Sequence, residues 1–333
     1  MHYLDFIYVI AGAAMLWVGA DWIVDSASAI ARKFNVSELV IGLTIVALGT
    51  SAPEFLVTAT AAFKGLEDIS LANVVGSNFF NLGIILGLMA LIRPIPTHRT
   101  ILYRDGLMLL AITTLVTVMA LDLRLERIEG ILLLVMFCGY LGFLLYLGKR
   151  MADRAKKVAE MGHAPAPKTA GPIEIPDQGG ERAATWKDYP KLALGFAGIA
   201  IGSDFLVEGA SSIATALGVS SWVIGLTIVA AGTSLPELVT CLAASLKKKN
   251  DMLLGNLIGS DFFNFAGVLG LTCLLRPIGV QETSLISMYV LVGATCTVMV
   301  FIRSGWSIGR WEGGTLLVFS LFRWGMEFAK GAG

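Results

Sequence analysis

The chain has 333 residues, of which 56% are hydrophobic and 15% charged, against roughly 25% charged residues in a typical soluble domain. Its 25 basic and 25 acidic residues cancel, so the net charge gives no sign of a nucleic-acid partner. The four cysteines lie singly within apolar stretches, which disfavours both disulfides and a cysteine metal site. This composition excludes an ordinary soluble domain and predicts an all-α polytopic membrane protein.

Apolar segments long enough to cross a hydrocarbon layer of ~30 Å occur in two groups of five. The predicted spans are 4–28, 38–63, 70–91, 101–121 and 128–148, then 189–214, 221–246, 252–274, 284–302 and 311–329. Between the groups, the segment 149–188 is basic and rich in proline, so we expect a solvated linker. The predicted organisation is a first five-helix repeat at 1–148, the linker, and a second five-helix repeat at 189–333.

The positions of Lys and Arg predict the orientation through the positive-inside rule. With the N-terminus outside, most of the 25 basic residues fall in inward loops and in the linker. We therefore expect a multi-pass protein of a prokaryotic plasma membrane, with both termini outside and the 149–188 linker in the cytoplasm.

The second group of spans repeats the first. At a constant offset of 183 residues, the chain aligns with itself without a gap from Gly19 to Ile95. Because each repeat has an odd number of spans, the second must enter the membrane from the opposite side, so the repeats are inverted. Secondary transporters have this architecture, and they bind their substrates near the midplane, where broken helices of the two repeats meet.

Each repeat carries a proline and an acid in the middle of its second span. Pro53 cannot donate a hydrogen bond to the carbonyl of Gly49, and Pro236 cannot donate one to that of Gly232, so each helix should bend or open there. The next residue in each repeat is a glutamate, Glu54 or Glu237. An acid at membrane depth usually marks an ion pathway; the alternative is a structural pair bonded to neighbouring helices.

The polar side chains near these acids offer only oxygen atoms. The candidate ligands are Thr50, Ser51, Glu54, Ser77 and Asn81 in the first repeat, and Thr233, Ser234, Glu237, Ser260 and Asn264 in the second. Oxygen ligands suit hard cations such as Ca²⁺, and a divalent ion would neutralise two facing glutamates. For each serine and threonine taken alone, a hydrogen bond between helices is the competing interpretation.

Four stretches carry a resemblance to a known family: Gly49-Thr-Ser-Ala-Pro-Glu54, Gly76-Ser-Asn-Phe-Phe-Asn81, Gly232-Thr-Ser-Leu-Pro-Glu237 and Gly259-Ser-Asp-Phe-Phe-Asn264. They resemble the two α-repeats of the cation/calcium exchanger superfamily, and the chain is most similar to the prokaryotic sodium/calcium exchangers. The resemblance implies the sodium/calcium exchanger fold, with ion sites formed by the second, third, seventh and eighth spans. It also implies that the first and sixth spans move across this core to alternate access.

The same resemblance implies that the candidate side chains supply oxygen ligands, and that backbone carbonyls near Ala47 and Ala230 add ligands for sodium. This chain departs from some relatives, which have an aspartate where it has Asn264 and an asparagine where it has Asp261. The role of Asp261, and any dependence on potassium, therefore stay open at the level of the sequence.

The expected function is antiport of sodium against calcium by alternating access. Calcium/proton antiport on the same scaffold stays open, although the hydroxyls beside each glutamate favour sodium, since protons need no further ligands. A passive cation channel is a third interpretation, which inverted repeats with broken helices disfavour. We expect no enzymatic activity and no cofactor. The expected partners are Ca²⁺, Na⁺ and the lipid bilayer, without nucleic acid or an obligatory protein partner.

Overall fold

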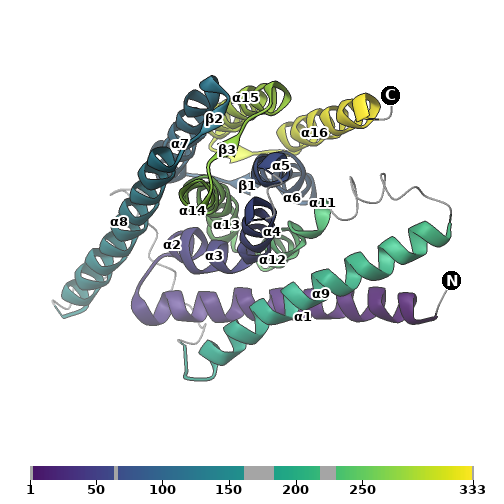
Figure 1. Cartoon of the computed structure of the whole chain (residues 1–333). Coiled ribbons are helices and arrows are strands. Elements are labelled where there is room, and N and C mark those ends of the chain that lie inside the picture. Colours follow the sequence, from purple (N-terminus) through teal and green to yellow (C-terminus); the bar gives the residue numbers. More distant parts are fainter. Residues whose placement is uncertain (1–2, 64–66, 161–183, 218–229, 332–333) are drawn as a thin grey trace.

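The computed structural model describes residues 3–63, 67–160, 184–217 and 230–331, which are almost entirely helical (Figure 1). Seven helices in these ranges are long and apolar enough to cross a membrane. An eighth span consists of two helical segments, Glu38–Thr50 and Ala52–Thr60, which meet at an angle of 44°. Two of the ten predicted spans are not among these eight: 221–246, which lies partly outside the described residues, and 311–329, which is helical as part of Arg310–Gly331.

The helices and strands follow the order of the two repeats. The first repeat comprises α1 (Tyr3–Phe34), α2 (Glu38–Ile41), η1 (Gly42–Val46), α3 (Ala47–Thr50), α4 (Ala52–Phe63), α5 (Glu67–Phe79), η2 (Phe80–Ile85), α6 (Leu86–Ile92), β1 (Ile95–Pro96), η3 (Ile101–Gly106), α7 (Leu107–Met119), η4 (Ala120–Asp122), β2 (Arg124–Leu125) and α8 (Arg127–Glu160). The second repeat comprises α9 (Asp188–Ala216), α11 (Ala230–Gly232), α12 (Leu235–Leu246), α13 (Asn250–Phe262), η6 (Phe263–Leu269), α14 (Gly270–Leu275), β3 (Ile278–Gly279), α15 (Glu282–Gly305), β4 (Ser307–Ile308) and α16 (Arg310–Gly331). Helix α8 continues to Glu160, twelve residues beyond the predicted end of its span at 148.

Two short strand pairs show how the repeats are related. Strand β1 pairs with β4, with Ile95 opposite Ile308, and β2 pairs with β3, with Leu125 opposite Ile278. At the offset of 183, Ile95 corresponds to Ile278 and Leu125 to Ile308, so one strand pair is the repeat image of the other. Corresponding strands therefore belong to different pairs, as inverted repeats require, and the predicted fold is confirmed.

The first helices of the two repeats cross each other at close range, and Figure 1 shows α1 and α9 together along one side of the cluster of the other helices. A Cβ atom added to Gly12 would lie 2.7 Å from the carbonyl oxygen of Gly202, and one added to Gly19 would lie 2.8 Å from that of Gly195. Only glycine allows this approach, and it brings the two backbones into direct contact.

Ion pairs join α1 to the end of α12. The Nζ atom of Lys247 lies 2.6 Å from Asp21 Oδ1 and 2.6 Å from Asp25 Oδ1, and Lys191 of α9 lies 3.4 Å from Asp25 Oδ2. These acids occupy the predicted first span, and their basic partners explain how they are accommodated there.

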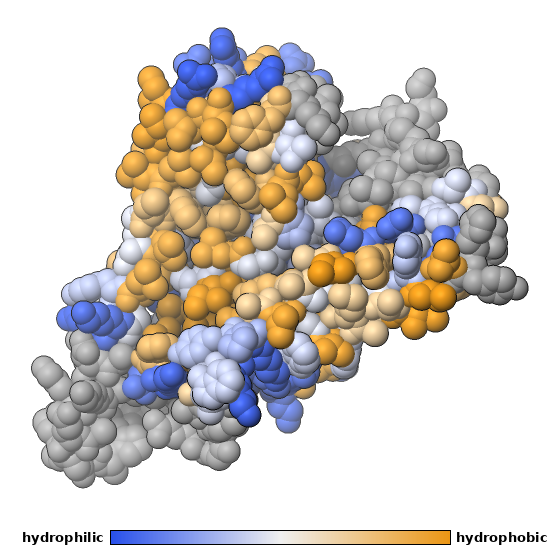
Figure 2. All heavy atoms as spheres, turned by 60° about the horizontal axis from the view of Figure 1, so that its bottom comes forward, coloured by the Kyte–Doolittle hydropathy of each residue, from blue (hydrophilic) through white to orange (hydrophobic). Residues whose placement is uncertain are grey.

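The outer surface is apolar, as a lipid environment requires. Figure 2 shows a broad hydrophobic area on one face, bordered by hydrophilic residues. Exposed apolar side chains on the outer helices include Val135 and Leu145 of α8 and Phe322 of α16. In a protein of this hydropathy, such side chains are expected to face lipid rather than a protein core.

Candidate cation site

The predicted bends occur at two serines that correspond to each other. Ser51, between α3 and α4, has φ −83° and ψ 9°, and Ser234, between α11 and α12, has φ −92° and ψ 5°. Each proline then stands in the first turn of the helix that follows, where backbone N–H groups have no helical partner. The missing N–H of Pro53 or Pro236 therefore costs little there, and the proline fixes the point at which the helix restarts.

The two glutamates lie in the same turns as these prolines. Glu54 is in the first turn of α4 and Glu237 in the first turn of α12, and the exposed fraction of each is 1%. The N-terminal end of a helix carries a partial positive charge, which stabilises a carboxylate in the first turn. Local sequence thus places one acid of each repeat at a buried, electrostatically favourable position.

Two hydrogen bonds cross between the repeats and bring the glutamates into one site. Ser51 Oγ donates to Glu237 Oε1 at 2.8 Å, and Ser234 Oγ donates to Glu54 Oε1 at 3.2 Å. The other carboxylate oxygen of each glutamate is buried and accepts no hydrogen bond from the described residues. No basic side chain in the described part of the chain pairs with either acid.

Helix α13 adds further oxygen atoms from the second repeat. Ser260 Oγ donates to Glu237 Oε1 at 3.3 Å and lies 3.4 Å from Thr50 Oγ1. Thr50 Oγ1 also donates to Asn256 Oδ1 at 3.1 Å. These contacts link α3, α12 and α13 around Glu237.

Two asparagines that were not among the predicted ligands support the site. Asn256 contacts Thr50, as above, and its repeat counterpart Asn73 donates to the backbone carbonyl of Glu54 at 3.3 Å. Each stands four residues before a predicted serine, Ser77 or Ser260, and therefore on the same helical face. That spacing, together with the match at the repeat offset, was a signal in the sequence for both residues.

The predicted asparagines lie in a second group of buried amides where α5 and α13 meet. Asn81, in the π-helical segment η2, donates from Nδ2 to Asp261 Oδ1 at 2.9 Å. Asn264, in the corresponding segment η6, donates to Asn78 Oδ1 at 3.0 Å, and Asn78 donates to the carbonyl oxygen of Asp261 at 3.2 Å. Single π-helical turns are frequent at functional sites.

The remaining predicted residues occupy the same elements. Ser77 is buried on α5, and the hydroxyl of Thr233 is buried without a hydrogen-bond partner among the described residues. The carbonyl of Ala47 in α3 accepts a hydrogen bond from Ser51 N at 3.0 Å, and Thr50 Oγ1 lies 3.3 Å from the same carbonyl oxygen. Ala230 is the first described residue of α11, and its side chain lies outside the described part.

The assembled groups suit a hard cation. They comprise carboxylate, hydroxyl, amide and carbonyl oxygens, the ligands that Ca²⁺ prefers. Among the described residues, no group of three or more His, Cys, Asp or Glu side chains could hold a metal ion. Hydroxyl and amide oxygens would therefore have to complete any coordination that the two glutamates begin.

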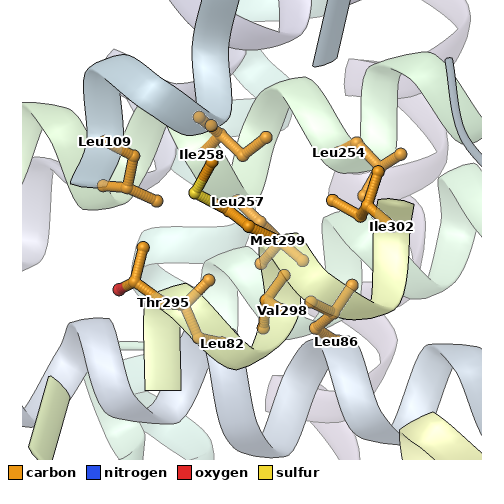
Figure 3. A pocket seen from close by; sticks show the side chains of 11 residues that line it. Leu82, Leu86, Leu109, Leu254, Leu257, Ile258, Thr295, Val298, Met299 and Ile302 are labelled. Carbon is orange, nitrogen blue, oxygen red and sulfur yellow. The ribbon is translucent and has the colours of Figure 1, made fainter. Parts of the chain in front are cut away.

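A separate pocket lies between η2, α6, η3, α7, α13 and α15 (Figure 3). Its lining is apolar except for Thr295, whose hydroxyl already donates to the carbonyl of Leu291 at 2.9 Å. This pocket offers no unpartnered oxygen ligand and is not a cation site.

Comparison with known proteins gives consistent matches over nearly the whole chain. The family described as Sodium/calcium exchanger protein matches residues 4–146 and 191–322. The sodium/calcium exchanger MaX1 of Methanosarcina acetivorans is 36% identical over 340 residues, covering 95% of this chain and 96% of its own length. The inner membrane protein YrbG of Escherichia coli is 34% identical over 269 residues, covering 81% of this chain and 79% of its own.

A solved structure shows the same fold. The sodium-calcium exchanger NCX_Mj, in a crystal soaked with zero Na⁺ and Ca²⁺, superposes with a TM-score of 0.80 at 33% identity, covering 97% of this chain and 98% of that one. The matched proteins named as exchangers are transporters and not enzymes. With its inverted repeats, its crossed glutamates and these matches, the chain belongs to the sodium/calcium exchanger family of membrane antiporters.

Proposed function

We propose that this antiporter exchanges Na⁺ for Ca²⁺, and that Ca²⁺ binds between Glu54 and Glu237. The observation that supports this assignment most directly is the crossed pair of hydrogen bonds from Ser51 and Ser234. They hold two buried carboxylates together while leaving one oxygen of each without a donor. Two carboxylates carry a charge of −2, which one Ca²⁺ ion neutralises.

The remaining ligands follow from the groups that surround the glutamates. We assign side-chain oxygens to the cation sites from these residues: Thr50, Ser51, Ser77, Asn81, Thr233, Ser234, Ser260 and Asn264. The carbonyls of Ala47 and Ala230 are assigned as additional sodium ligands. Sodium is favoured over protons as the coupling ion because hydroxyl and carbonyl oxygens solvate a metal ion, whereas a proton on a glutamate needs none of them.

Charge accounts for obligatory exchange. Two ionised, unpaired carboxylates are costly to enclose within protein and lipid. The transporter should therefore switch between its outward-open and inward-open states only with cations bound. Binding of either Ca²⁺ or Na⁺ neutralises the acids, and each loaded form can then cross. We assign the movement to α1 and α9, which form a pair outside the core that carries the glutamates.

The decisive experiment is uptake of radioactive calcium into proteoliposomes. Vesicles loaded with Na⁺ are diluted into sodium-free buffer, and a parallel series is driven by a pH gradient without sodium. Glu54→Gln and Glu237→Gln provide controls of nearly unchanged shape. Sodium exchange predicts uptake that requires internal Na⁺, ignores the pH gradient and is lost in both variants. Uptake that follows the pH gradient would establish proton coupling instead, and no gradient-driven uptake by folded protein would refute the calcium assignment.

For the orientation, we propose that both termini face outward and that the 149–188 linker is cytoplasmic. The basic loops support this orientation through the positive-inside rule. Arg124 beside β2 would then be external and Ser304 beside β4 internal, and both are exposed. In intact cells, a membrane-impermeant maleimide should label Arg124→Cys above the wild-type background and leave Ser304→Cys at that background. The reverse pattern would invert the assignment.

A further inference from the structure

Two arginines lie beside one tryptophan where α15 ends. There the chain turns at Trp306, which has φ 52° and ψ 29° and whose carbonyl accepts a hydrogen bond from Thr97 N at 2.8 Å. The guanidinium carbon of Arg303 lies 5.5 Å from the centre of the Trp306 ring, and that of Arg99 lies 5.9 Å from it. We call residues 95–99 and 303–308 the Trp306 corner.

The two guanidinium groups of the Trp306 corner have no acidic partner. Arg99 and Arg303 are both exposed, and neither forms an ion pair with a described residue. Their contacts with the indole face are cation–π contacts, which position an arginine without neutralising it. Two positive charges are therefore available to one anionic ligand.

The first repeat forms the same backbone corner without these side chains. Leu123, the counterpart of Trp306 at the offset of 183, has φ 64° and ψ 24°, and its carbonyl accepts a hydrogen bond from Val280 N at 2.9 Å. The counterparts of Arg303 and Arg99 are Ala120 and Glu282. The turn thus needs neither an arginine nor an aromatic ring, so the fold alone does not account for the side chains of the Trp306 corner. Because the repeats are inverted, the counterpart corner lies at the opposite membrane face.

The Trp306 corner is at the level where the apolar helices end. Three of the candidate membrane spans end or begin at the segments that form it. The exposed ring of Tyr103 lies 6.3 Å from that of Trp306, between ring centres. One helical turn farther from the corner, Leu107 and Val300 are exposed as well. Aromatic and basic side chains at the ends of spans lie among lipid headgroups, and exposed apolar side chains beside them face acyl chains.

An anionic phospholipid matches this combination of groups. Guanidinium groups bind phosphate oxygens through charge-assisted hydrogen bonds, and the negative charge compensates the arginines. A soluble phosphate would use the arginines alone, whereas a phospholipid would also place its acyl chains against Leu107 and Val300.

We propose that Arg99 and Arg303, positioned by Trp306, bind the phosphate headgroup of an anionic phospholipid. In the orientation proposed above, this lipid belongs to the inner leaflet. The binding itself depends neither on that orientation nor on which ions are transported.

The test is titration of the purified full chain in a neutral detergent with dioleoyl phosphatidylglycerol, and in parallel with dioleoyl phosphatidylcholine. Native mass spectrometry counts the bound lipids and gives the dissociation constant. Phosphatidylglycerol should bind the wild type more tightly than phosphatidylcholine. Arg99→Gln/Arg303→Gln should weaken phosphatidylglycerol binding about 30-fold, since each arginine near a membrane surface contributes about a factor of five.

The counterpart corner supplies a control of equal charge. Arg124→Gln/Arg127→Gln removes two positive charges from exposed positions next to Leu123, and it should leave phosphatidylglycerol binding unchanged. Trp306→Leu is a second test that keeps both arginines, and Leu123 shows that a leucine adopts this backbone conformation. It should weaken binding about threefold through loss of the cation–π contacts, and it replaces the arginine variant should that variant not fold.

Three results would overturn the proposal. One is an equal loss of binding in the control pair, which would mean that charge at any position suffices. Another is equal affinity of the wild type for the two lipids. The third is binding of sn-glycerol 3-phosphate as tightly as phosphatidylglycerol, which would assign the arginines to a soluble phosphate. None of these results involves calcium uptake, so failure of the sodium/calcium assignment is distinguishable from failure of this site.

Discussion

Replacement of Gly255 by alanine should disturb the cation site through the backbone. Helix α13 crosses α2 and η1 so closely that a Cβ atom on Gly255 would lie 2.5 Å from the carbonyl oxygen of Leu39 and 3.0 Å from the nitrogen of Leu43. Side-chain Cβ atoms essentially never approach other atoms closer than 3.0 Å, and backbone atoms cannot rotate away. The two helices must therefore separate by about half an ångström or more.

The cost follows from this displacement. Overpacking of a tight interior costs about 1–3 kcal/mol, which corresponds to a fall in melting temperature of about 3–10 °C. The same crossing carries the contacts of Thr50 with Asn256 at 3.1 Å and with Ser260 at 3.4 Å. A shift of half an ångström takes the longer contact out of hydrogen-bonding range. Misplacement by 1 Å can reduce function about 100-fold. We therefore expect the initial rate of calcium uptake, measured at a calcium concentration that does not saturate the transporter, to fall about tenfold.

Thermal unfolding in detergent and sodium-driven calcium uptake measure the two effects. Gly139→Ala on α8 is the matched control, because a Cβ atom added there meets nothing within 4 Å. It should leave uptake unchanged and raise stability slightly, by up to about 1 kcal/mol. A Gly255→Ala variant as stable and as active as the wild type would refute the claim that this crossing is rigid and that it positions the site.

Two further substitutions test contacts between the outer helices and the core. Ser203→Ala removes a hydroxyl of α9 that donates to the carbonyl of Gly232 at 2.6 Å. The variant should lose about 1–2 kcal/mol of unfolding free energy, which is measured as a lower melting temperature. An unchanged melting temperature would mean that another donor replaces the hydroxyl. Lys247→Met removes two ion pairs of 2.6 Å whose side chains are 26% to 45% exposed, so solvent screening should limit the loss to about 1 kcal/mol. This loss should shrink in 1 M choline chloride, and the exposed neighbour Lys248→Met should lack it; equal effects of the two lysines would argue against these pairs.

The architecture could be predicted from the sequence because the second half of the chain can be aligned with the first. One offset of 183 residues aligns the repeats, and an odd number of spans makes them inverted. The bends at Pro53 and Pro236 follow from the missing N–H group, which is a local property. That the two GTS-x-PE segments meet followed from the inverted architecture, and the crossed hydrogen bonds of Ser51 and Ser234 agree with it.

Features that depend on distances between helices could not be predicted from the sequence. The donor chain from Asn264 through Asn78 to Asp261 depends on how α5 and α13 cross, and the crossing distance is not encoded in spacing along either helix. The end of α8 shows a different limit. Hydropathy locates the end of an apolar span at 148, whereas Lys, Arg, Ala and Glu residues continue the helix to Glu160 because they are good helix formers.

Differences between the repeats should determine which access state the transporter prefers. In inverted repeats, one open state is converted to the other by exchanging the roles of the two halves, so identical repeats would give both states equal energy. The bond from Ser203 to Gly232 breaks this equality, because the counterpart of Ser203 in α1 is Ala20, which has no hydroxyl for the counterpart carbonyl of Gly49. One hydrogen bond of about 1.4 kcal/mol changes the ratio of the two states about tenfold. Ser203→Ala should therefore reduce the preference for the state described here, and Ala20→Ser should do so independently by stabilising the other state.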